Sequence, residues 1–78
     1  MIFKNKGATY TANATTNELV QSYLTSQNDE EQRIAYNALK TFVKHKLRQQ
    51  HKVSPIRILN ILIDERGIIT VKTHPKRD

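Results

Sequence analysis

The chain has 78 residues, and 13 Lys and Arg against 7 Asp and Glu give it a net charge of +6. This length allows a single domain over residues 1–78, and the absence of cysteine excludes disulfide bonds, thiolate nucleophiles and cysteine-ligated zinc. No apolar run could cross a bilayer, and the first residues lack the apolar core of a secretory signal. We therefore expect a cytoplasmic protein without membrane contact, and its Lys-, Asn-, Gln- and Thr-rich composition suits a phage or plasmid gene.

The first segment, residues 1–15, is expected to form a short hairpin or a loose arm. Asn5-Lys6-Gly7 is a turn-forming sequence, and the residues after it, Ala8 to Thr11, are β-branched or aromatic enough for a strand. A helical region over residues 16–52 follows. Its first helix is expected over about residues 16–26, because Thr15 and Glu18 have the spacing of a capping box.

The second helix has the clearest signals and is expected over residues 29–51. Asn28 can cap it, and Asp29, Glu30 and Glu31 place negative charge in its first turn. Basic residues fill its last third, where cations suit the helix dipole, and no Gly or Pro interrupts it. At 1.5 Å per residue this helix is about 34 Å long.

A C-terminal β-hairpin is expected over residues 56–73, followed by a basic tail over residues 74–78. Its strands are rich in β-branched residues, and Asp64-Glu65-Arg66-Gly67 suits a type I turn followed by a glycine bulge. The fold class is therefore α+β, with two helices packed on this antiparallel hairpin and a further short N-terminal hairpin. The apolar character of both hairpin faces favours a homodimer, in which a second copy covers the face that the helices leave open.

A winged helix-turn-helix is the alternative fold. Ser54 could cap a third helix with Pro55 at its first position. This alternative ranks second, because apolar residues between Ile56 and Ile63 would cover all sides of such a helix, whereas a recognition helix needs a polar face.

Positive charge is concentrated in the second half of the chain. Residues 1–32 carry two lysines against four acidic residues, whereas residues 33–78 carry eleven basic groups against three acidic ones. On a helical wheel of the second helix, much of this charge falls on one face, opposite the apolar positions. We call this face the basic strip; its residues are Arg33, Asn37, Lys40, Lys44, Arg48 and His51. Lys52, Arg57 and Lys72 are expected to flank it.

The basic strip favours a nucleic-acid partner, DNA rather than RNA. Its cations can lie along phosphates, and no carboxylate follows Glu31 in this helix to neutralise them. The predicted C-terminal strands hold no aromatic residue on which unpaired bases could stack, which favours a duplex. The simplest other interpretation is a solvated helix face without a partner.

The expected function is therefore that of a non-enzymatic accessory or regulatory protein that binds duplex DNA. Capping, turns or the tail account for every acidic residue, the histidines lack metal-ligand spacing, and two glycines cannot form a phosphate-binding loop. We accordingly expect no catalytic residue, no metal and no cofactor. The alternative is a small protein-interaction module, an inhibitor or adaptor, that docks on a larger partner.

Overall fold

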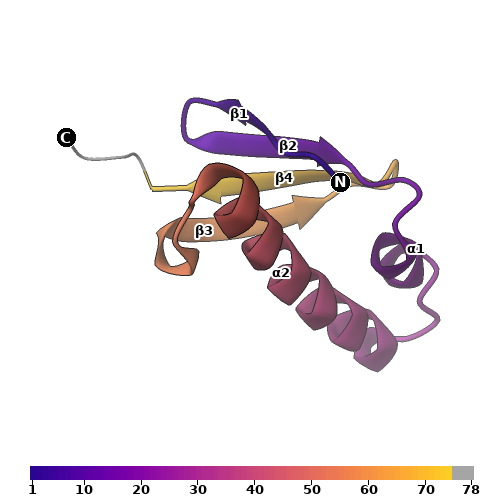
Figure 1. Ribbon diagram of the computed structural model, residues 1–78. Helices are drawn as coiled ribbons and strands as arrows, with labels where there is room; N and C mark the ends of the chain where they lie inside the picture. The colour runs from indigo at the N-terminus through magenta and orange to yellow at the C-terminus, as the bar shows by residue number, and fades with distance from the viewer. Residues whose placement is uncertain (75–78) are drawn as a thin grey trace.

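The computed structural model describes residues 1–74 and has an α+β fold with two helices and a four-stranded antiparallel sheet (Figure 1). The strands lie in the order β1-β2-β4-β3. The elements are β1 Lys4–Lys6, β2 Thr9–Asn13, α1 Glu18–Leu24, α2 Asp29–His51, the 3-10 turn η1 Pro55–Arg57, β3 Ile58–Ile63 and β4 Ile68–Thr73. Of the predicted tail, only His74 is described, and residues 75–78 lie outside the described part.

The N-terminal hairpin is confirmed, but its turn lies at residues 7–8 and not at the predicted Asn5-Lys6-Gly7. Asn5 and Lys6 belong to β1, and Lys6 pairs with Thr9, so the chain reverses at Gly7 and Ala8. Gly7 has φ of +65°. This backbone conformation is open to glycine without steric cost, which explains why the reversal falls at this residue.

Helix α1 is shorter than the predicted residues 16–26, and its cap is a different residue. The Asn17 side-chain oxygen accepts hydrogen bonds from the backbone N–H groups of Leu19 and Val20, at 2.9 and 3.3 Å. The Thr15 side chain instead donates to the Asn13 side-chain oxygen at 2.9 Å. The predicted capping box at Thr15 is therefore wrong. Asparagine caps at least as well as threonine, and Asn17 lies two residues closer than Thr15 to the apolar residues of α1.

Helix α2 begins and ends at the predicted residues. The Asn28 side chain accepts from the Glu31 N–H at 2.9 Å, and the Glu31 carboxylate accepts from the Gln27 N–H at 3.2 Å. At the other end Lys52 adopts the left-handed conformation, with φ of 57°, and its N–H bonds to the Arg48 carbonyl at 3.0 Å. Both ends are therefore fixed by local capping.

The C-terminal hairpin is confirmed, and its turn has the predicted geometry. The Asp64 carboxylate accepts from the N–H groups of Arg66 and Ile68, both at 2.9 Å, and Gly67 adopts φ of +82°. These bonds, the one from Ile68 first, lower the pKa of the Asp64 carboxyl below its usual 3.8, as does the nearby Arg66 charge. The alternative winged helix-turn-helix is wrong, because Pro55–Arg57 forms only a 3-10 turn before the chain enters β3.

The core lies between α2 and one face of the sheet. Leu39, Val43 and Leu47 of α2 are fully buried, together with Ile69 and Val71 of β4. Figure 1 shows α2 crossing the sheet diagonally, with its N-terminal half extending beyond the strands towards α1. Helix α1 packs against this half of α2, so neither helix of residues 1–74 covers the opposite face of the sheet.

The residues before β1 are held by the last turn of α2. The Gln50 side chain accepts from the Phe3 N–H and donates to the Met1 carbonyl, both at 2.8 Å. A ring nitrogen of His51, Nε2, lies 2.6 Å from the Phe3 carbonyl oxygen, and the His51 ring packs on Tyr10. The Phe3 side chain is buried in the core, so this segment is a fixed part of the fold rather than a loose arm.

Candidate nucleic-acid interface

Helix α2 presents five of the six residues of the basic strip along one side. Arg33, Asn37 and Arg48 are exposed, whereas Lys40 and Lys44 are half-buried. These residues recur every three or four positions, so they share one side of the helix, next to the side that packs on the sheet. From Arg33 to Arg48 the strip is about 22 Å long.

No carboxylate of residues 1–74 forms an ion pair with a cation of the strip. Within residues 1–74 the one ion pair joins Arg66 to Asp64, at 3.4 Å, and both belong to the β3–β4 turn. The acidic residues of α2 all lie in its first turn, where the helix dipole and the cap account for them. The strip therefore carries uncompensated positive charge along most of α2.

Lys40 is positioned by an aromatic pair. Its ammonium group lies 5.4 Å from the centre of the Tyr36 ring, which in turn packs on Tyr23 of α1 at 5.8 Å. Burial raises the pKa of Tyr36 above its usual 10.0, and the nearby Tyr23 adds to this effect. The Tyr36 hydroxyl stays protonated at neutral pH and donates to the Ile61 carbonyl at 2.8 Å.

The strip ends in a small hollow at the C-terminus of α2. Arg48, Lys52 and Ser54 line this hollow, which has a volume of about 390 Å³. The Ser54 side chain makes no capping hydrogen bond to the 3-10 turn that follows. Two cations and a hydroxyl are groups that bind a phosphate oxygen.

The remaining predicted residues are distributed differently. The side chain of His51 is half-buried, and its Nε2 atom contacts the carbonyl oxygen of Phe3. The His51 ring therefore faces the N-terminal segment. Arg57 donates from its guanidinium to the His74 carbonyl at 3.2 Å. Lys72 is exposed between the buried Val71 and Thr73, which places it on the sheet face opposite α2. The structure thus separates Lys72 from the strip.

Two basic residues that sequence reasoning missed lie on the same sheet face as Lys72. Lys4 pairs with Thr11, and Lys6 pairs with Thr9, which pairs with Lys72 on its other side. In a strand, Lys4 and Lys6 point to the same face because side chains alternate. The predicted turn at Asn5-Lys6-Gly7 excluded these residues from a strand, so this face was missed.

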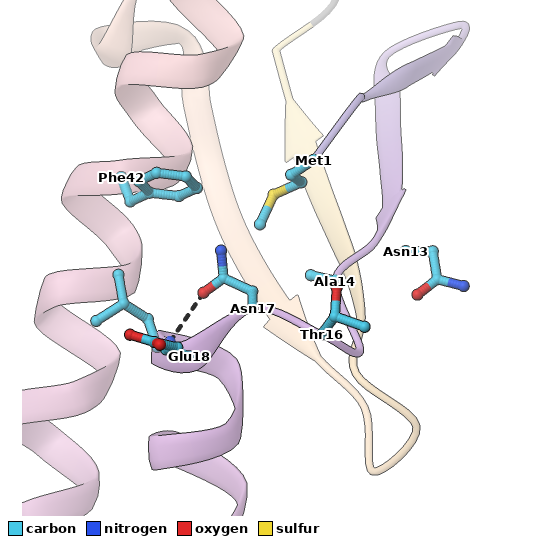
Figure 2. A pocket seen from close by; sticks show the side chains of 8 residues that line it. Met1, Asn13, Ala14, Thr16, Asn17, Glu18 and Phe42 are labelled. Atoms are coloured by element: carbon cyan, nitrogen blue, oxygen red, sulfur yellow. Dashed lines mark hydrogen bonds between the residues drawn. The ribbon is translucent and has the colours of Figure 1, made fainter.

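A hollow beside the N-terminal segment offers little chemistry. It lies between Met1, the start of α1 and Phe42 of α2, with a volume of about 460 Å³ (Figure 2). Its one carboxylate is that of Glu18, and the Asn17 side-chain oxygen is already used in capping α1. Among residues 1–74, no group of three or more His, Asp or Glu side chains is placed to hold a metal ion.

Neither helix in the described residues is both long and apolar enough to span a membrane. Comparison with known proteins gives no match to a protein-family model, to a curated protein or to a solved structure.

Proposed function

We propose that the protein is a non-enzymatic nucleic-acid-binding protein, of accessory or regulatory type, that places the basic strip of α2 along the phosphates of duplex DNA. The observation that carries this proposal is the uncompensated charge of the strip. Arg33, Lys40, Lys44 and Arg48 share one side of a single helix, and the one ion pair of residues 1–74 lies elsewhere. Solvated helix faces usually mix both signs of charge.

A duplex fits this surface better than a single strand. Single-strand recognition uses bases stacked on exposed aromatic side chains. Tyr10 is the one aromatic residue in the described strands, and it is 6% exposed and packed beneath α2. A straight helix with cations on one side instead suits a regular line of phosphates. Asn37 can add a hydrogen bond from the same side, whereas the Thr41 hydroxyl donates to the Asn37 carbonyl at 3.2 Å.

A salt titration tests the proposal quantitatively. If about five basic groups contact phosphates, the logarithm of the binding constant should fall with the logarithm of salt with a slope near −4.5. Binding to a short duplex should then weaken by roughly 500-fold between 50 and 200 mM salt. A slope near zero, or no retention of the duplex at 50 mM salt, contradicts the proposal.

Paired charge reversals separate the strip from net charge alone. Lys44→Glu with Arg48→Glu should abolish retention of the duplex and leave the melting temperature nearly unchanged. Lys46→Glu with Arg66→Glu makes the same change in net charge away from the strip, since Lys46 lies over the Phe42 ring and Arg66 lies in the β3–β4 turn. Equal loss of binding in both variants would show that net charge, and not the strip, holds the DNA.

The same experiments distinguish the alternative function, an inhibitor or adaptor that docks on a larger protein. That function predicts a stoichiometric protein partner on purification and no shift of a duplex in a gel. The proposed function predicts nucleic acid that co-purifies at low salt, raises the ratio of absorbance at 260 to 280 nm, and is lost at high salt.

A further inference from the structure

The sheet face turned away from α2 forms a second surface that carries positive charge. Alternate residues of every strand point to it, because Tyr10, Ala12, Ile61, Ile69 and Val71 point to the core. We call it the open sheet face; the strand residues on it are Lys4, Lys6, Thr9, Thr11, Asn13, Asn60, Leu62, Ile68, Thr70 and Lys72. Three of them are lysines and none is acidic.

The strand register brings the three lysines together. One row across the sheet reads Lys6, Thr9, Lys72 and Asn60, and the next row begins with Lys4 and Thr11. Neighbouring strands lie about 4.8 Å apart, so Lys6 and Lys72 are about 10 Å apart across β2. Lys4 and Lys6 are separated by about 7 Å along β1. All three lysines are exposed.

This arrangement is complementary to a phosphodiester backbone. Successive phosphates of one DNA strand lie about 3.4 Å apart along the duplex axis, so three lysines whose strand positions lie within about 12 Å can contact phosphates of one strand. Thr9 places a hydroxyl group between Lys6 and Lys72, Thr11 places one beside Lys4, and hydroxyls donate to phosphate oxygens. No aromatic residue points to this face from the strands, so it can hold the backbone of a duplex but cannot stack bases.

We propose that the open sheet face binds a second DNA duplex, so that one molecule bridges two duplex segments. The bridging role rests on the proposed function of the basic strip. The sheet lies between the two surfaces, because α2 packs on one face of it and the three lysines stand on the other. A straight duplex held along α2 therefore leaves the open sheet face free for another.

A capture assay tests bridging directly. A biotinylated duplex on beads is incubated with the protein and a second, fluorescent duplex of the same length, and the captured fluorescence is measured. The wild-type protein should capture the second duplex. Lys6→Glu with Lys72→Glu should reduce that capture by about tenfold or more, because the lost contacts are with phosphates, while the affinity for a single duplex changes by no more than about threefold.

Matched variants separate the possible outcomes. Lys44→Glu with Arg48→Glu should lose both single-duplex binding and capture, whereas Lys46→Glu with Arg66→Glu should keep both. Lys4→Glu with Lys6→Glu provides a second pair on the open sheet face, and circular dichroism checks that each variant is folded. The sedimentation mass of the wild type separates bridging by one molecule from bridging by two copies of a dimer.

Three results would overturn the inference. Capture that is undiminished in both open-face pairs means that another surface, or dimerisation, joins the duplexes. Single-duplex binding without capture in the wild type refutes the bridging role and leaves the proposed function standing. Absence of single-duplex binding refutes both proposals together.

Discussion

The hydroxyl of Tyr36 on α2 donates a hydrogen bond to the carbonyl oxygen of Ile61 at the unpaired edge of β3. The Asp64 N–H donates to the Ile68 carbonyl, and hydrogen-bonded pairs alternate along an antiparallel ladder, so Leu62 also directs its backbone groups to β4. Ile61, the residue before Leu62, directs its carbonyl oxygen away from β4, towards the outer edge of the sheet. Exposed backbone groups at a sheet edge are a template for pairing with another chain. The Tyr36 hydroxyl occupies one of them and ties α2 to the edge.

Replacement of Tyr36 by phenylalanine tests this role. Tyr36→Phe should lower the free energy of unfolding by about 1 kcal/mol, because it leaves the Ile61 carbonyl without its partner. It should also increase concentration-dependent association, since Leu59 and Leu62 beside this edge are 58% and 44% exposed. Urea unfolding and sedimentation velocity measure the two effects. Tyr23→Phe, which keeps the ring contact to Tyr36, is the control and should show neither.

Gly67 and Gly7 both adopt positive φ, but they should differ in tolerance to substitution. A Cβ at Gly67 would lie 2.9 Å from the Thr15 Cα, whereas nothing lies within 4 Å of one at Gly7. Gly7→Ala should cost about 1 kcal/mol from the left-handed conformation alone. Gly67→Ala should cost about 2–4 kcal/mol, because the segment at Thr15 must also move.

Asparagine at the same two positions separates the two causes. Asparagine tolerates the left-handed region, so Gly7→Asn should recover most of the stability lost in Gly7→Ala. Gly67→Asn should remain strongly destabilised, since its Cβ meets Thr15 in the same way. Chemical denaturation of the four variants gives the comparison, and equal costs at both positions would show that the close approach to Thr15 is unimportant.

Gln50→Ala should loosen the N-terminal segment. The substitution removes the bonds to the Phe3 N–H and the Met1 carbonyl, at a cost of about 1–3 kcal/mol. The Phe3 amide should then exchange its hydrogen with solvent at least about tenfold faster, as NMR can measure residue by residue. Gln49→Ala, at the exposed neighbouring position, should leave that rate unchanged. An unaltered Phe3 rate in Gln50→Ala would mean that the buried ring alone holds the segment.

The turn carboxylate Asp64 should make part of the stability depend on acidic pH. Because its pKa is lowered in the folded state, chiefly by the bond from the Ile68 N–H, the unfolded chain takes up the proton first as the pH falls. This stabilisation is complete above the unfolded value of 3.8 and is lost as the pH falls through the lower folded value.

Unfolding experiments between about pH 6 and about pH 2 measure this dependence. Asp64→Asn removes the titrating group while its side-chain oxygen can still accept hydrogen bonds, so its stability should fall less steeply below about pH 4 than that of the wild type. Glu65→Gln, in the same turn, should retain the steeper fall. Parallel curves for the wild type and Asp64→Asn would rule out a contribution from Asp64.

The elements that were predicted best are those fixed by neighbouring residues. Asn28 and the acidic first turn define the start of α2, and the Val53-Ser54-Pro55 sequence predicts its end, which the structure places at His51. The turn at Asp64–Gly67 is likewise closed by its own side chain and glycine. Local capping and turn chemistry are readable from sequence because the partners lie within four residues of each other.

Features that depend on distant partners were not readable. The register of β2 on β4 pairs Tyr10 with Val71, and no local pattern specifies that match. It is this pairing that places Lys4 and Lys6 beside Lys72 on the open sheet face. Within the basic strip the spacing of cations was predictable from helical periodicity, but the contact of His51 with Phe3 required the N-terminal segment to fold back on α2.

The strand order also dictates when this protein can acquire its structure during synthesis. β4 leaves the ribosome last among the strands, yet it lies between β2 and β3 and holds the two hairpins together. A nascent chain that ends before residue 68 can form α2 but has no strand with which to join its first and second halves. The sheet and its core therefore assemble only after β4 has been synthesised, because β4 closes the contacts between the N-terminal hairpin and β3.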